Sequence, residues 1–166
     1  MKTDLNSSIE TSGKDKSIYC TLILGIGNIL RKDDGVGIHV INKLRAKDLP
    51  AGVKLLDGGT AGLDLLTYLE DIDRLIIVDA ILADGNPGTI SVLPAEKLNS
   101  GKSSFSVHSH GIADIIDMSA ALWKRLEAVI IGIIPKDCES YEIGLSEEVE
   151  DSVDKAVQII MELTKG

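Results

Sequence analysis

The amino-acid sequence predicts an α/β fold, in which a mostly parallel sheet of about five strands carries helices on both faces. Short aliphatic runs typical of buried strands alternate with segments whose apolar residues recur at helical spacing. Arg74–Ala80 (RLIIVDA) has the continuous aliphatic stretch of a central parallel strand buried on both faces. The chain has 166 residues, the length of one domain. We therefore expect a single domain over residues 17–166 and a flexible N-terminal tail over residues 1–16.

The first strand is expected at Ser17–Gly25 (SIYCTLILG), an apolar run rich in β-branched residues that a glycine closes. An amphipathic helix is expected over Gly35–Lys47, where apolar residues keep a helical spacing. Asp33 and Asp34 stand before it, where the helix dipole favours acidic residues. Val53–Asp57 (VKLLD) has the composition of a second strand.

A glycine-rich loop and a short helix over Leu63–Glu70 are expected ahead of the central strand Arg74–Ala80. The sequence Asn-Pro-Gly at residues 86–88 indicates a turn, and the next strand is expected at Thr89–Leu93. Residues 94–107 are polar and only weakly patterned.

Helical spacing returns over Gly111–Leu122, and Ala128–Ile134 (AVIIGII) predicts a buried strand that Pro135 closes. The final helix is expected to begin at Ser146, a residue type suited to an N-cap. Strands and helices thus alternate along the chain, and no internal repeat is present.

Composition excludes several classes of function. The chain carries 17 Lys and Arg against 26 Asp and Glu, a net charge of −9 without a long basic cluster, which disfavours a nucleic-acid binder. Its apolar runs are far shorter than the roughly 20 residues of a membrane helix. The polar N-terminus has no hydrophobic signal segment, so we expect a cytoplasmic protein. Cys20 and Cys138 form no metal or redox motif and are interpreted as incidental thiols.

A glycine pattern after the first strand begins like a dinucleotide-binding fingerprint, with Gly25 and Gly27 in place. Leu30 stands where the third glycine belongs, which predicts that the close contact between helix and strand is lost. Asp33 and Asp34 would also repel a pyrophosphate. Nucleotide binding is therefore disfavoured.

Polar residues gather where the predicted strands end, which is where ligands bind in such sheets. Asp34 follows the first strand, Asp57 ends the second, Asp79 ends the third, and His108 precedes a helix. Two carboxylates and one imidazole with open positions suit a divalent transition ion such as nickel, zinc, manganese or iron. Asp114 could orient the imidazole of His108.

Each of these residues also has a purely structural interpretation. Asp34 or Asp33 could cap the following helix. Asp79 could be a buried carboxylate satisfied by backbone N–H groups of the next turn. His108 and His110 could be an exposed pair in a polar loop. The spacing alone leaves these alternatives open.

Four segments, in this order, resemble the [NiFe]-hydrogenase maturation endopeptidases. They are GIGNILRKDDGVG at Gly25–Gly37, DGGTAG at Asp57–Gly62, LIIVDA at Leu75–Ala80 and HSHG at His108–Gly111. The resemblance implies a three-layer α/β/α sandwich and an endopeptidase that removes the C-terminal extension of the hydrogenase large-subunit precursor after nickel insertion. It also implies that Asp34, Asp79 and His108 form the catalytic, metal-contacting triad, although some members carry Glu at the position of Asp34.

The resemblance further implies that the nickel belongs to the precursor, whose half-built active site the triad would touch before cleavage. Other divalent ions are expected to enter the open site in vitro. We expect Asp57 and the glycine loop after it to form a wall of the substrate cleft, and residues 94–107 to influence partner choice. Two alternatives remain: a non-catalytic, nickel-dependent binding or chaperone module for the immature subunit, and a nucleotide enzyme of similar fold.

Overall fold

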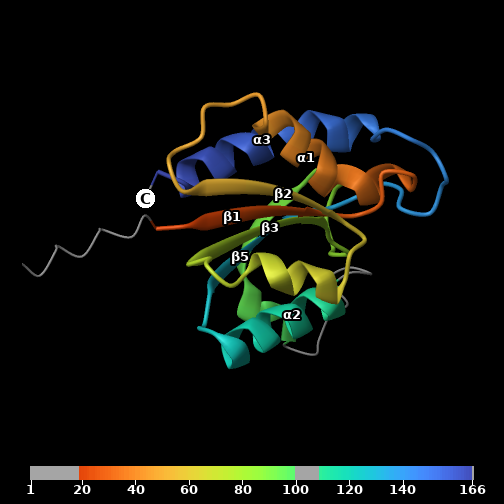
Figure 1. Ribbon diagram of the computed structural model, residues 1–166. Helices are drawn as coiled ribbons and strands as arrows, with labels where there is room; N and C mark the ends of the chain where they lie inside the picture. The colour runs from red at the N-terminus through yellow and green to blue at the C-terminus, as the bar shows by residue number, and fades with distance from the viewer. Residues whose placement is uncertain (1–18, 100–108, 166) are drawn as a thin grey trace, which may run out of the picture.

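The computed structural model describes residues 19–99 and 109–165 (Figure 1). Its sheet has five strands in the order β2-β1-β3-β5-β4. Strands β2, β1, β3 and β5 are parallel to one another, and only β4 runs antiparallel to its neighbour β5. The strands are β1 (Thr21–Ile26), β2 (Val53–Gly59), β3 (Arg74–Ala80), β4 (Ile90–Pro94) and β5 (Glu127–Ile133). The prediction of a mostly parallel sheet of about five strands is confirmed.

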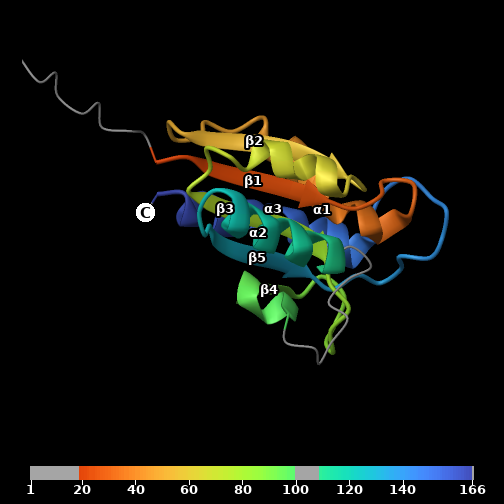
Figure 2. The same cartoon turned by 60° about the horizontal axis from the view of Figure 1, so that its bottom comes forward.

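Helices cover both faces of the sheet, as Figures 1 and 2 show. Helices α1 (Val36–Leu44) and α3 (Glu147–Leu163) pack together on one face. Helix α2 (Ser109–Leu122) and the 3-10 helix η2 (Leu63–Tyr68) pack together on the other. The fold is thus the expected three-layer α/β/α sandwich.

The central strands supply the core of both outer layers because their side chains alternate between the faces. Ile23 of β1 is fully buried in the cluster beneath α1 and α3. Its neighbours Leu22 and Leu24 are buried in the cluster beneath η2 and α2. Strand β3 divides in the same way, with Ile76 in the first cluster and Ile77 in the second. A strand buried on both faces explains the continuous aliphatic run of β3.

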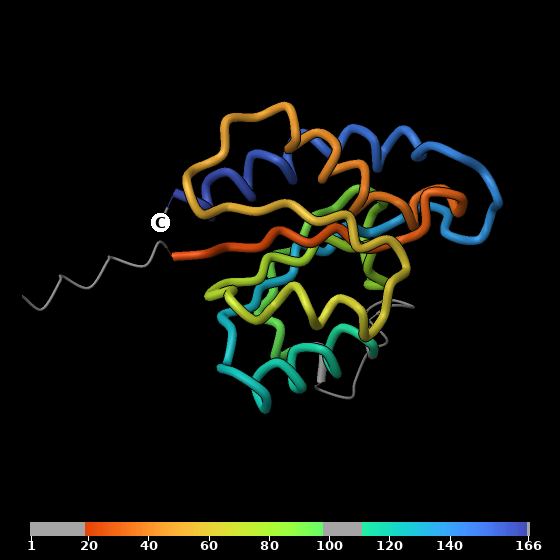
Figure 3. Tube along the Cα trace, viewed as in Figure 1, coloured from red at the N-terminus to blue at the C-terminus, as the bar shows by residue number. Residues whose placement is uncertain are grey.

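Parallel register brings the carboxyl ends of β1, β3 and β5 to one edge of the sheet. Gly25 lies opposite Val78, and Asp79 lies opposite Gly132. The loop after β1 (residues 27–35, the β1–α1 loop) and the loop after β5 (residues 134–146, the β5–α3 loop) both leave from this edge (Figure 3). The chain continues from β1 toward β2 on one side and from β3 toward β5 on the other, so this edge is the switch point where such sheets bind ligands.

Helix α1 packs closely on the sheet, contrary to the prediction drawn from the missing third glycine. Gly37, inside α1, supplies the contact instead. A Cβ atom there would overlap the carbonyl oxygens of Val78 and Ile26. The small residue is therefore needed seven residues further along the chain than the fingerprint places it.

Other differences concern element ends. The segment expected as a helix over Leu63–Glu70 is the 3-10 helix η2, which ends at Tyr68. A further 3-10 helix, η3 (Ala95–Asn99), occupies the start of the polar stretch 94–107. The predicted tail, residues 1–16, lies outside the described residues, so the domain boundary stays a prediction. None of the helices in the two described ranges is long and apolar enough to cross a membrane.

Candidate active site at the carboxyl edge of the sheet

The β1–α1 loop places Asp34 at the carboxyl edge. The chain turns at Gly27, whose φ of 133° is open to glycine and rarely adopted by other residues. A Cβ atom on Gly27 would overlap the carbonyl oxygen of Asp34. The backbone N–H of Asn28 donates to Asp34 Oδ2 at 2.9 Å, and Asp34 is only 6% exposed. The loop thus folds back on itself and encloses this carboxylate.

Asp34 is not the N-cap of α1. It lies in the 3-10 helix η1 (Lys32–Gly35), and Gly35 occupies the N-cap position without any side-chain capping bond. The capping interpretation of Asp34 is therefore wrong. Its carboxylate instead accepts a hydrogen bond from within the β1–α1 loop, at the carboxyl edge of the sheet.

Asp79 supplies a second buried carboxylate at the same edge. It is the penultimate residue of β3 and is 5% exposed. Strands β1 and β5 flank it on both sides. Burying a carboxylate costs several kcal/mol unless charge or hydrogen bonds compensate it. Carboxylate oxygens are donors that divalent cations accept, so these two groups have the chemistry that the predicted site requires.

Cys138 shows that the two carboxylates share one neighbourhood. This thiol lies in the β5–α3 loop and is partly buried. Its pKa is raised to about 12, first by burial and then by the negative charges of Asp34, Asp33, Asp79 and Asp137. Because the charges of both Asp34 and Asp79 raise the pKa of this thiol, we infer that the β5–α3 loop approaches the two carboxylates. Sequence reasoning missed this loop.

We expect Cys138 to resist alkylation by iodoacetamide in the folded protein at pH 8. Only the thiolate reacts, and a pKa of about 12 leaves about one thiol in ten thousand ionised at that pH. Peptide mass mapping of alkylation at Cys138, in native protein and in urea, checks this. Asp79→Asn removes one of the charges and should speed the reaction. Equal labelling rates in native and unfolded protein would contradict the assignment.

The glycine loop after β2 lies beside the β1–α1 loop. The backbone N–H of Gly27 donates to the Gly59 carbonyl oxygen at 2.9 Å. Asp57, which is exposed, accepts a hydrogen bond from the Gly59 backbone at 3.0 Å. Gly58 leaves no room for a side chain, because a Cβ atom would lie 2.7 Å from Leu24 Cδ1. The end of β2 therefore lies beside the β1–α1 loop, and the expectation that Asp57 and the glycines after it line a substrate cleft stays a prediction.

The third member of the predicted triad, His108, lies outside the described residues. So does the side chain of His110, although its backbone is in the first turn of α2. Asp114, the expected partner of His108, is exposed on α2. Within the described residues no group of three or more His, Cys, Asp and Glu side chains is arranged to hold a metal ion. The structure therefore brings together two of the three predicted residues, and the triad stays a prediction.

A partly enclosed cavity lies elsewhere. It has a volume of about 280 Å³, lies between α2, η3 and β5, and is lined by Ala95, Ala113, Ile116 and Ala128, among others. Neither Asp34 nor Asp79 lines it. We consider the carboxyl edge the better candidate, because it carries two buried carboxylates at the switch point of the sheet.

Comparison with known proteins identifies the family that this geometry fits. A family model described as hydrogenase maturation protease matches residues 38–163. The hydrogenase 2 maturation protease of Escherichia coli K12 is 36% identical over 146 residues, which cover 84% of this chain and 87% of that protein. The hydrogenase expression/formation protein HupD of Bradyrhizobium diazoefficiens is 36% identical over 160 residues, or 92% of this chain and 82% of that protein.

Solved structures agree with these sequence matches. The hydrogenase maturating endopeptidase HybD from Escherichia coli superposes with a TM-score of 0.79 at 33% identity, covering 88% of this chain and 92% of that one. The [NiFe] hydrogenase maturation protease HybD from Thermococcus kodakarensis gives a TM-score of 0.75 at 35% identity, covering 87% and 99%. The sheet, its covering helices and the carboxyl edge thus have counterparts along nearly the whole described chain.

Proposed function

The chain belongs to the hydrogenase maturation protease family, and we propose that it removes the C-terminal extension of a [NiFe]-hydrogenase large-subunit precursor after nickel has been inserted. The observation that carries this proposal is the pair of buried carboxylates, Asp34 and Asp79, at the switch point of the sheet. In the proposal the nickel is cargo of the precursor, and the two carboxylates meet it there together with His108.

The chemistry of these groups supports the proposal. Carboxylate oxygens and a neutral imidazole are suitable donors to a divalent transition ion. A divalent ion with open positions polarises a nearby carbonyl group and lowers the pKa of bound water. Water then adds to the scissile carbonyl, the C–N bond breaks, and the released amine takes a proton. We propose that Asp34 or Asp79 accepts the proton of that water as general base.

Recognition of nickel in the precursor also accounts for the small number of ligands that this protein supplies. A closed structural metal site uses four strong ligands, often thiolates. The ligand set proposed here contains no thiolate. Two carboxylates and one imidazole leave coordination positions for the ligands of the precursor. The protease would therefore bind nickel weakly by itself and recognise it only in its proper setting.

The test is the intact mass of a purified large-subunit precursor before and after incubation with this protein. Nickel-loaded and nickel-free precursor are compared in parallel. We expect loss of a short C-terminal peptide from the loaded precursor alone, because the nickel-free precursor offers nothing for Asp34 and Asp79 to contact. No mass change, with occupancy and complex formation verified, would refute the protease proposal and favour the non-catalytic binding module.

A further inference from the structure

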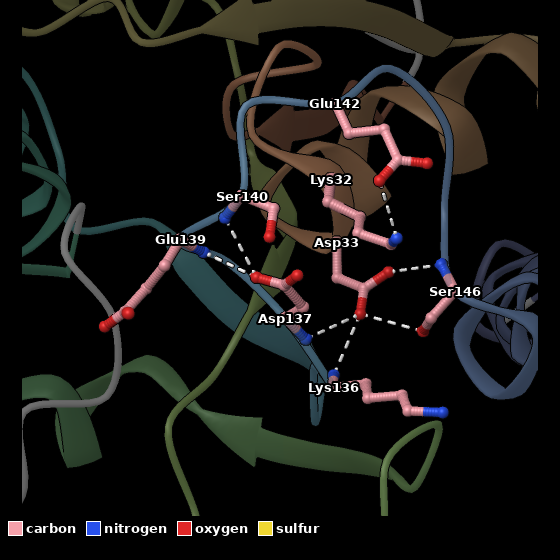
Figure 4. Close-up of polar contacts among 8 residues, drawn as sticks. All are labelled: Lys32, Asp33, Lys136, Asp137, Glu139, Ser140, Glu142 and Ser146. Carbon is pink, nitrogen blue, oxygen red and sulfur yellow. Dashed lines mark hydrogen bonds and ion pairs between the residues drawn. The ribbon is translucent and has the colours of Figure 1, made fainter.

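Asp33, the neighbour of Asp34, has no place in the chemistry proposed above, yet it is completely buried. Both of its carboxylate oxygens accept hydrogen bonds from the β5–α3 loop (Figure 4). Oδ2 accepts from the backbone N–H of Lys136 at 2.9 Å and of Asp137 at 3.0 Å. Ser146 donates its backbone N–H to Oδ1 at 2.6 Å and its hydroxyl to Oδ2 at 2.8 Å.

Ser146 occupies the N-cap position of α3, as predicted, but its side chain makes no capping bond. Its hydroxyl donates to Asp33 instead, and a donated proton is the reverse of what a capping oxygen does. The start of α3 is thus tied to the β1–α1 loop, 113 residues earlier in the chain.

N–H and O–H groups stabilise the charge of Asp33, whereas the two lysines drawn in Figure 4, Lys32 and Lys136, pair with other carboxylates. Lys32 Nζ binds Glu142 at 2.9 Å, and Lys136 Nζ binds Glu148 at 2.7 Å. Hydrogen bonds to an ionised acceptor are stronger than those between neutral groups. A neutral amide at residue 33 could not replace them, because each amide orientation would set an N–H group against at least one backbone N–H.

The same two loops are joined along their backbones. The N–H of Asp33 donates to the Asp137 carbonyl oxygen at 3.0 Å, and the N–H of Lys32 donates to the Glu142 carbonyl oxygen at 2.8 Å. Residues at the start, middle and end of the β5–α3 loop are thus all attached to residues 32 and 33. The next residue along the chain is Asp34.

We propose that Asp33 is the positioning residue of the active site: it fastens the β5–α3 loop to the β1–α1 loop and so fixes where Asp34 presents its carboxylate. This inference rests on the proposed function of Asp34. Asp33 and Asp34 have different partners. Asp33 accepts hydrogen bonds from the β5–α3 loop, whereas Asp34 accepts one from Asn28 and lies at the carboxyl edge. A displacement of about 1 Å at a reacting group can cost about a hundredfold in rate. We call the hydrogen bonds from Lys136, Asp137 and Ser146 to Asp33 the latch. Loosening the latch should therefore slow the chemical step.

Asp33→Asn tests the proposal, with Asp73→Asn as the matched control. Asp73 is a partly buried carboxylate that also accepts a backbone N–H, that of Cys20 at 2.8 Å, but it lies just before β3 begins, at the opposite end of that strand from Asp79. For cleavage of nickel-loaded precursor, we expect Asp33→Asn to lower kcat by about 10- to 100-fold with KM changed less than threefold. Asp73→Asn should stay within about twofold of the wild-type kcat.

Hydrogen exchange reports on the latch independently of activity. In Asp33→Asn the amides of Lys136, Asp137 and Ser146 should exchange faster, because they lose their acceptor. If that variant does not fold, Ser146→Ala serves in its place. It removes one of the four bonds and should lower kcat by about two- to fivefold.

Three results would overturn the inference: unchanged exchange at these amides, a wild-type kcat in folded Asp33→Asn, or a rise in KM alone. A wild-type protein that fails to cut nickel-loaded precursor would refute the proposed function instead. The exchange experiment would still test the latch in that case.

Discussion

Replacing Asp79 by Asn should slow cleavage of nickel-loaded precursor by about 10²- to 10⁴-fold while the protein stays folded. Asparagine keeps the shape of the side chain but removes the negative charge, so it is a poor ligand and no base. Asp34→Asn should have an effect of similar size for the same reason. A neutral group at a buried, 5% exposed position also avoids the cost of burying a charge, so we expect no large loss of stability.

Asp151→Asn is the control for that experiment. Asp151 is an exposed carboxylate on α3 with no part in the proposed chemistry, and its loss should leave the rate unchanged. Cleavage is followed by intact mass over time, and folding is followed by circular dichroism. A wild-type rate in Asp79→Asn, with nickel occupancy of the precursor verified, would show that the site lies elsewhere.

Gly37→Ala should destabilise the protein by about 3 kcal/mol or more. In a helix alanine is normally favoured over glycine by about 1 kcal/mol. Here the added Cβ would overlap the carbonyl oxygens of Val78 and Ile26 and lie 2.7 Å from the Ile26 nitrogen. These are backbone atoms of β3 and β1, which cannot move aside without distorting the sheet. The steric penalty therefore outweighs the gain in helix propensity.

Gly111→Ala is the matched control, because Gly111 is also helical but a Cβ there meets nothing within 4 Å in the described part of the chain. It should be neutral or slightly stabilising. Urea unfolding of both variants measures the free energies. At about 2–4 °C per kcal/mol for a domain of this size, Gly37→Ala should also melt roughly 10 °C lower. Equal stability of the two variants would mean that α1 does not approach the sheet as closely as described.

Much of the fold could be predicted because the core strands carry a strong local signal. The aliphatic run at residues 75–78 is buried on both faces, and its strand, β3, has the predicted bounds. The antiparallel direction of β4 could not be predicted, since strand direction depends on the path of the chain between strands. The close packing of α1 was also misjudged, because Gly37 lies outside the fingerprint position that the pattern tests.

The rule that ligands bind beyond the carboxyl ends of parallel strands pointed to Asp34, Asp57, Asp79 and His108. The structure places Asp34 and Asp79 at that edge, and His108 lies outside the described residues. The same rule applied to β5 would have pointed to residues 134–146, but those residues form no recognisable motif. The partners of Asp33 lie 103 to 113 residues away, a distance at which the sequence gives no local signal. The hydrogen bond from the Ser146 hydroxyl to Asp33 cannot be predicted from the sequence for the same reason.

Nickel K-edge X-ray absorption tests the contact between this protein and its cargo most directly. The spectrum of nickel-loaded precursor is recorded alone and after mixing with one equivalent of protein, frozen before intact mass shows cleavage. We predict additional oxygen or nitrogen neighbours of nickel with the wild-type protein and none with the Asp34→Asn/Asp79→Asn double variant. An unchanged nickel spectrum in a wild-type sample that goes on to cleave its precursor would contradict the account.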